Sequence, residues 1–150
     1  MTTTNVLFVC GDNSATSIMA EAILRAAGPG FAAHSAGFQP ALALRPGLGE
    51  FLRTRHLSTE GLAPKSYTRF VEPRGPRLDF AIMLCDAVPV PSPEWNGEPV
   101  VAHWGLDEDD DMRAAFWVLT RRIKIFASLP HGRASRRAIQ ERVHSIAVWQ

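Results

Sequence analysis

Apolar residues along the chain recur with two different spacings. Short runs rich in β-branched and aromatic residues, bounded by polar residues, predict strands that are buried on both faces of a parallel sheet. These runs cover residues 6–10, 31–36, 80–85 and 99–103. Elsewhere apolar residues recur every three or four positions, which is typical of helices with one buried face. The helices that this spacing predicts cover residues 17–27, 46–55, 111 to near 130, and 135 onward.

Strands that alternate with helices favour an α/β fold. Such a fold has an open parallel sheet with helices on both faces, in three layers, joined by right-handed crossovers. A chain of 150 residues with 46% hydrophobic content is large enough for one core, so we expect a single domain over residues 1–150. Ligands of such sheets bind at the carboxyl ends of the strands. Cys10, Cys85 and Trp104 fall near that edge.

Composition and charge exclude several classes of function. The formal net charge of +1 gives no overall attraction to nucleic acid or to an anionic membrane. The first apolar run is too short for a signal peptide or a membrane span, so we expect a cytoplasmic protein. The five histidines show no ligand spacing with cysteine or carboxylate, so we expect no metal site and no cofactor. Cys10 and Cys85 each end a predicted strand, which favours free thiols over a disulfide.

The segment from Cys10 to Ser17 combines a strand end, a turn of small or polar residues and a helix start. The turn consists of Gly11, Asp12, Asn13, Ser14, Ala15 and Thr16. Successive backbone N–H groups of such a turn point at one spot, at the positive end of the helix dipole, which favours binding of an anion. The same field favours the nucleophilic thiolate of Cys10, and Ser17 is placed to donate a hydrogen bond to the sulfur. Asn13 tolerates the positive φ that a tight turn of this kind requires.

Several short segments resemble the low-molecular-weight protein tyrosine phosphatases and the related thioredoxin-coupled arsenate reductases. The segments are Phe8–Cys10, Asn13–Ser14, Ser17, Met19–Glu21, Ser35–Gly37, Cys85–Asp86, His103–Gly105 and Arg113–Pro130. The resemblance spans nearly the whole chain and implies a flavodoxin-like fold with four parallel strands. It also implies a Cys-x5-Arg loop that holds phosphate or arsenate, attack by the cysteine, and an aspartate from a late loop that protonates the leaving group.

Two residues of the loop differ from the pattern that the resemblance implies. The family arginine would fall at position 16, where this chain has Thr16. A guanidinium grips an oxyanion through two charge-assisted hydrogen bonds, whereas threonine offers one neutral hydroxyl. Asp12 stands where many members have a small uncharged residue, and a carboxylate beside an anion site repels the ligand. Both changes predict a weaker site with impaired catalysis.

The general acid and the redox relay also depart from the pattern. The family has an Asp-Pro pair in the loop after the Trp104 region, and this chain has an acidic run without proline. Asp107 and Asp109 are the candidates for the general acid; the alternative is a solvated run that caps the following helix. Cys85 matches the first of two resolving cysteines of the reductases, and Ser92 stands near the position of the second. The alternative for Cys85 is packing in the core.

The residues of the loop support three hypotheses. The first is a phosphatase-like protein with a degenerate loop that binds phosphate, sulfate or an arsenate-like oxyanion, or that acts as a protein interaction module. The second is an active phosphatase or arsenate reductase in which another arginine, such as Arg45 or one from the C-terminal helices, reaches the loop. The third is redox sensing by Cys10. Basic residues from Arg121 to Arg142 offer a docking surface for an acidic protein partner, with a solvated face as the alternative. Trp104 either packs at the sheet edge or walls the pocket.

Overall fold

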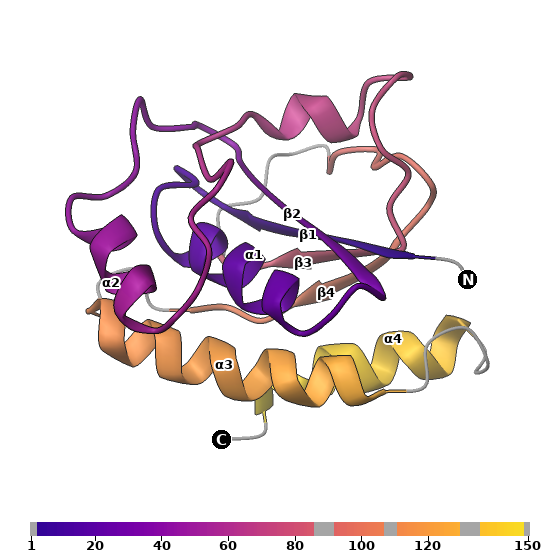
Figure 1. Cartoon of the computed structure of the whole chain (residues 1–150). Coiled ribbons are helices and arrows are strands. Elements are labelled where there is room, and N and C mark those ends of the chain that lie inside the picture. The colour runs from indigo at the N-terminus through magenta and orange to yellow at the C-terminus, as the bar shows by residue number, and fades with distance from the viewer. Residues whose placement is uncertain (1–2, 86–91, 107–110, 130–135, 149–150) are drawn as a thin grey trace.

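The computed structural model describes residues 3–85, 92–106, 111–129 and 136–148, and a parallel sheet forms its centre (Figure 1). Four strands form this sheet, in the order β2-β1-β3-β4. They are β1 (Thr4–Cys10), β2 (Phe31–Gly37), β3 (Phe80–Met83) and β4 (Val100–His103). Each strand was predicted from its apolar run, and the four-stranded parallel α/β fold of the flavodoxin-like type is confirmed.

The described residues also form helices. They are α1 (Thr16–Ala26), α2 (Leu48–Thr54), η1 (Tyr67–Phe70), α3 (Met112–Ser128), α4 (Arg136–Ser145) and η2 (Ile146–Val148), where η1 and η2 are short 3-10 helices. The α-helices lie where the apolar spacing predicts them. α3 begins directly after Asp111, whose side-chain oxygen accepts a hydrogen bond from the backbone N–H of Ala114 at 2.8 Å. Asp111 is therefore a helix cap, as one of the two interpretations of the acidic run expects for this residue.

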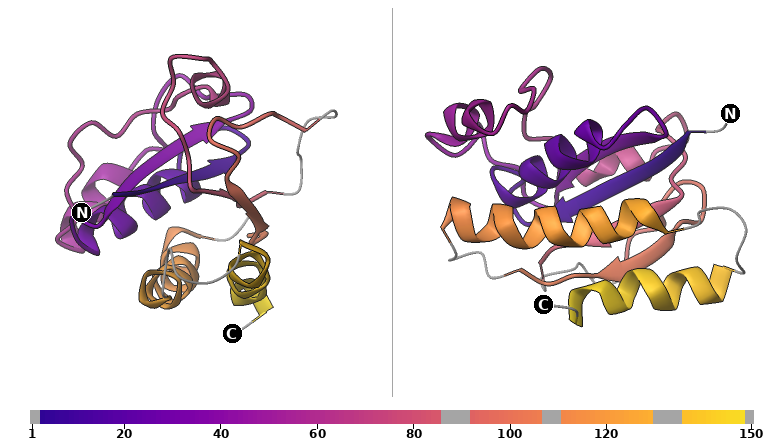
Figure 2. Two further views of the ribbon diagram at one scale, coloured as in Figure 1. Left: turned by 90° about the vertical axis from the view of Figure 1, so that its right-hand side faces the viewer. Right: turned by 60° about the horizontal axis from the view of Figure 1, so that its bottom comes forward.

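The helices α1, α3 and α4 cover one face of the sheet (Figure 2). Because side chains alternate along a strand, Val6, Phe8 and Ile82 all point toward this layer. Trp104 belongs to the same core: it is 1% exposed and donates its Nε1–H to the carbonyl oxygen of Val143 at 2.8 Å. The indole thus packs inside the protein and anchors α4 to the end of β4.

The opposite face of the sheet is covered by η1 and the loops around it. Leu7, Val9 and Met83 form one buried apolar cluster with Phe70 of η1. Three half-buried rings extend this cluster toward solvent, those of Phe38, Tyr67 and Trp95. The 3-10 helix was not predicted, because four residues are too few to show a helical repeat.

Candidate functional site

Cys10 ends β1, and its side chain is buried (2% exposed). Its sulfur lies 2.8 Å from the hydroxyl oxygen of Ser17, in the first turn of α1. The backbone N–H of Asn13 also donates to the sulfur, at 3.1 Å. The segment of residues 10–17, called the Cys10 loop below, therefore folds back so that its polar hydrogens meet the thiol.

Asn13 holds the Cys10 loop in shape through both ends of its side-chain amide. Nδ2 donates to Ser17 Oγ at 2.7 Å, and Oδ1 accepts from the backbone N–H of Lys65 at 2.7 Å. Because Ser17 Oγ accepts from Asn13, its single hydrogen is available for the sulfur of Cys10. Asn13 has a φ of 53°, so it occupies the left-handed region that the sequence predicts for this turn.

The backbone carbonyls of the Cys10 loop point away from its centre. Four of them accept hydrogen bonds from N–H groups of the neighbouring segment 38–45. The pairs, given as donor and acceptor residue, are Phe38 with Cys10 (3.2 Å), Gln39 with Gly11 (2.8 Å), Ala41 with Asp12 (2.9 Å) and Arg45 with Ser14 (3.0 Å). Within the described part of the chain, the N–H groups of Gly11, Asp12 and Ala15 have no hydrogen-bond acceptor. Outward carbonyls and unpaired amides are the arrangement that a loop needs if it is to hold an anion.

Gly37 explains why the loop and β2 approach so closely. It pairs with Cys10 in the sheet register. A Cβ atom at this position would lie 2.9 Å from Asn13 Cβ and 2.9 Å from the carbonyl oxygen of Gly11. Only a residue without a side chain fits against the loop without displacing it.

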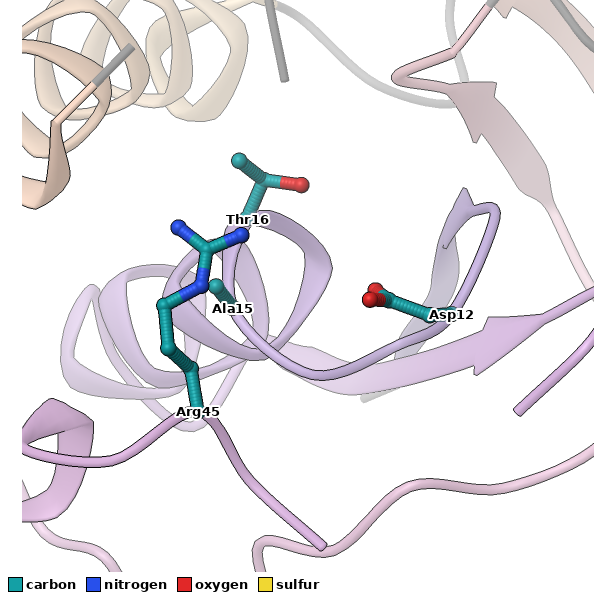
Figure 3. Close-up of a pocket in the computed structure, with 4 residues that line it drawn as sticks. All are labelled: Asp12, Ala15, Thr16 and Arg45. Atoms are coloured by element: carbon teal, nitrogen blue, oxygen red, sulfur yellow. The ribbon is translucent and has the colours of Figure 1, made fainter. Parts of the chain in front are cut away.

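The opening of the loop is a small pocket, called the pocket mouth below. It is lined by Asp12, Ala15, Thr16 and Arg45. Figure 3 shows the Arg45 side chain rising beside Ala15 with its guanidinium next to Thr16, and the Asp12 carboxylate directed toward the same space from the other side. The Asp12 carboxylate also accepts from the backbone N–H of Ser14 at 3.1 Å. A cation, a carboxylate and a neutral hydroxyl therefore share this pocket.

The start of α1 has no compensation from its own N-cap or first-turn side chains. Its N-cap residue is Ala15, which makes no side-chain hydrogen bond, and the first turn contains no acidic residue. The hydroxyl of Thr16, a residue that is 9% exposed, makes no hydrogen bond to another described residue. The positive end of the helix dipole thus faces the pocket mouth without an intrahelical partner.

A buried polar cluster lies behind the loop. Glu21 of α1 is 5% exposed and accepts from Ser35 Oγ at 2.5 Å and from Arg25 at 2.7 Å. The ammonium group of Lys65 lies 3.7 Å from the same carboxylate. Burial lowers the pKa of Lys65, and the attraction of Glu21 opposes this shift in part. The cluster joins α1 and β2 to Lys65, the residue whose backbone N–H holds Asn13. The sequence analysis missed Lys65, because no pattern around it points to a loop residue 52 positions away.

The other predicted site residues lie apart from this geometry. Asp107 and Asp109, the candidates for the general acid, lie outside the described residues. Cys85 is buried just after β3, and Ser92 is exposed. Neither Cys10 nor Cys85 forms a disulfide bond. Among the described residues, no group of histidine, cysteine or carboxylate side chains could hold a metal ion, and no helix is long and apolar enough to cross a membrane.

Comparison with known proteins agrees with this architecture. The family model described as low molecular weight phosphotyrosine protein phosphatase matches residues 5–89. A thioredoxin-dependent arsenate reductase of Corynebacterium glutamicum is 28% identical, with a TM-score of 0.67 over 82% of this chain. This chain covers 59% of the length of that protein. No curated protein matches the sequence.

Two further solved structures share the fold. An arsenate reductase of Archaeoglobus fulgidus is 25% identical, with a TM-score of 0.64 over 83% of this chain and 99% of its own. A low molecular weight protein tyrosine phosphatase of Streptococcus pyogenes is 14% identical, with a TM-score of 0.65 over 90% of this chain and 97% of its own. The family model covers more than half of the chain and includes the whole Cys10 loop. The chain therefore belongs to the low molecular weight phosphotyrosine protein phosphatase family.

Proposed function

We propose that the Cys10 loop binds a phosphate- or arsenate-like oxyanion and that its catalysis on this ligand is impaired. The observation that carries the binding proposal is the direction of the loop carbonyls. Their hydrogen bonds to segment 38–45 leave the N–H groups of Gly11, Asp12 and Ala15 without acceptors in the described chain. Together with the uncapped start of α1, these groups supply several donors and a positive field at one place.

Impaired catalysis is inferred from the two polar residues of the pocket mouth. Thr16 supplies a hydroxyl where a guanidinium would stabilise the charge that develops in the transition state. Loss of such a group costs a factor of roughly 10² to 10⁵ in rate. The Asp12 carboxylate accepts the hydrogen bond of the Ser14 N–H, so this donor is not free for a ligand. The carboxylate also places a negative charge where an anionic ligand would enter, which repels it.

A second candidate function is favoured by the position of Arg45. Its backbone N–H is bound to the carbonyl oxygen of Ser14, so the base of its side chain is fixed to the loop itself. Its guanidinium lines the pocket mouth beside Thr16 (Figure 3). If this displaced arginine replaces the missing one, the protein is an active phosphatase or arsenate reductase.

In the phosphatase reaction the Cys10 thiolate would attack phosphorus, and the bond from phosphorus to the ester oxygen would break. Asp107 or Asp109 is our candidate for the acid that protonates the leaving oxygen. Water would then hydrolyse the phosphocysteine and release phosphate. In arsenate reduction the Cys10 thiolate would bond to arsenic with release of water. A second thiol, for which Cys85 is the candidate, would then attack the Cys10 sulfur, so that the bond from sulfur to arsenic breaks, arsenite leaves and a disulfide forms. An external dithiol would reduce this disulfide. Both reactions need Cys10 as a free thiol, which fits a cytoplasmic location.

Two measurements on the purified protein test these candidates. Isothermal calorimetry with inorganic phosphate tests binding, and release of nitrophenol from an aryl phosphate tests catalysis. Our proposal predicts saturable phosphate binding with little or no turnover. The displaced-arginine alternative predicts turnover that disappears in Cys10→Ser and falls sharply in Arg45→Met. Absence of saturable phosphate binding would overturn both candidates.

A further inference from the structure

The outward side of α3 carries a row of basic residues around one tryptophan. A helix advances about 100° per residue. Five residues of α3 consequently fall within an arc of about 80° on one side of the helix. They are Arg113, Trp117, Arg121, Lys124 and Ser128, and all five are exposed. We call the first four of these residues the α3 surface.

Trp117 is an unusual residue on this side of the helix. Its side chain is 65% exposed, and among the described residues only Leu42 is another exposed large hydrophobic residue. The opposite side of α3 is the buried one, where Leu119, Ile123 and Phe126 belong to the core. Trp117 is therefore not needed to attach α3 to the sheet.

The charge of the α3 surface is one-sided. The sequence of α3 contains no aspartate or glutamate. Arg55, the residue directly after α2, adds a further cation near α3, with its guanidinium carbon 5.6 Å from the ring centre of Phe116. The ion pairs found among the described residues both involve Glu21, so the cations of the α3 surface have no ion-pair partner there. The carboxylate of Asp111, at the start of α3, is used as the helix cap.

We propose that the α3 surface docks an acidic segment of a partner protein, with Trp117 as the apolar anchor. Tryptophan is enriched among the residues that dominate interface energies, and complementary charges steer association and fix the register. The row from Arg113 to Lys124 is about 16 Å long, which an extended peptide of about five residues would span. The partner segment would combine aspartate or glutamate with one apolar residue placed against the indole.

Other occupants fit this surface less well. A membrane would need several apolar side chains on the same arc, and Trp117 is the only one there. If the α3 surface paired with the α3 surface of a second copy across a twofold axis, the cations of the two surfaces would lie close together and repel each other. A nucleic acid is bound through many phosphate contacts over a broad basic footprint, whereas this row is narrow and the net charge of the chain is +1. An acidic peptide matches both the length and the charge.

The test uses the whole protein and a fluorescein-labelled peptide of about eight residues, made of glutamate with one central leucine. Fluorescence anisotropy measures its affinity at low and at high salt. We expect saturable binding that weakens as salt rises, because exposed charges are screened. Trp117→Ala should weaken binding roughly 30-fold, and a peptide with serine in place of leucine should bind wild type about as weakly. Arg121→Glu combined with Lys124→Glu should abolish binding.

Matched controls separate this surface from general attraction. Leu42→Ala removes the other exposed large hydrophobic residue, and Arg74→Glu reverses an exposed cation outside α3; both should bind the peptide like wild type. Thermal unfolding should show that all variants keep the fold. Equal affinity of wild type and Trp117→Ala would overturn the proposal. Tighter binding of a single-stranded oligonucleotide of equal charge would also overturn it. A protein that sediments as a dimer and, in that form, no longer binds the peptide would do the same. The outcome does not depend on whether the Cys10 loop binds phosphate.

Discussion

The Cys10 loop and its pocket mouth are two adjoining regions that differ in what determines them. The loop is shaped by backbone hydrogen bonds to segment 38–45 and by the buried amide of Asn13. The mouth is determined by the three polar side chains that line it, those of Asp12, Thr16 and Arg45. In our proposal the first region supplies the peptide N–H groups of an anion site, while the second carries Thr16 where the family resemblance implies an arginine. Under this proposal shape and charge depend on different residues, and substitutions should separate them.

Asn13→Ala should have the largest effect, because it changes the loop itself. The substitution leaves the half-buried N–H of Lys65 without its acceptor and forces alanine into a left-handed φ. We expect a loss of about 3 kcal/mol in the free energy of unfolding and loss of phosphate binding. Urea denaturation and calorimetry measure the two effects. Asn13→Gly should recover about 1 kcal/mol, since glycine accepts the backbone conformation; equal losses in both variants would show that backbone strain plays no part.

Gly37→Ala should distort the loop from the side of β2. The new Cβ would meet Asn13 and the carbonyl oxygen of Gly11 at 2.9 Å, so we expect a destabilisation of about 1–3 kcal/mol together with weaker phosphate binding. The control is Gly49→Ala in α2, where a Cβ meets nothing within 4 Å. That variant should be stabilised by about 0.5–1 kcal/mol. Thermal unfolding of the pair compares them, and a neutral Gly37→Ala would contradict the close approach.

Thr16→Arg should change the pocket mouth and leave the loop intact. A guanidinium at this position adds charge-assisted hydrogen bonds, so the phosphate affinity should rise about 10- to 100-fold with little change in stability. Thr16→Gln, which has a long but neutral side chain, is the matched control and should raise affinity far less. Equal phosphate affinities of wild type and Thr16→Arg, measured by calorimetry, would remove the electrostatic account of the mouth.

The smallest expected effect concerns His34 on β2, next to the buried cluster behind the loop. Burial lowers the pKa of His34, and Lys65 lowers it further, whereas Glu21 opposes the shift. The unfolded chain then takes up a proton more readily than the folded protein near the ordinary histidine pKa of about 6.5. Stability is thus complete above this pH and falls as the pH drops through it toward the lower pKa of the folded state.

His34→Gln checks this dependence. Urea denaturation of both proteins at several pH values between 5 and 8 should show a shallower decline on the acid side in the variant. Besides the charges of Glu21 and Lys65, two neutral neighbours surround the ring: it lies 5.5 Å from the ring of Phe70, and its Nε2 lies 3.3 Å from Asn5 Oδ1. Parallel pH profiles of the two proteins would show that His34 is not the titrating group.

The sequence predicts the framework of this fold well, because its strands and helices bury continuous or periodic apolar faces. The shape of the Cys10 loop could also be anticipated, because the turn joins a strand end directly to a helix start and Asn13 tolerates a positive φ. These features are local in the chain. Local patterns are what a single sequence shows most directly.

Contacts between distant segments could not be obtained from such patterns. The bond from Lys65 to Asn13 joins residues 52 positions apart. Arg45 was one of several arginines that the sequence left open, and only the fold places it at the pocket mouth. Trp104 had two possible positions, and its bond to Val143 of α4 decides between them. η1 was missed for a different reason, since its four residues show no repeat.

The central claim is that backbone N–H groups of the Cys10 loop bind an oxyanion. A phosphate titration of the ¹⁵N-labelled protein, followed by NMR, tests it most directly because each amide reports separately. We predict saturable shifts that are largest for the amides of residues 11–17 and that are absent in Asn13→Ala. Saturable shifts confined to the basic side of α3, or no saturable shift in the loop, would contradict the account.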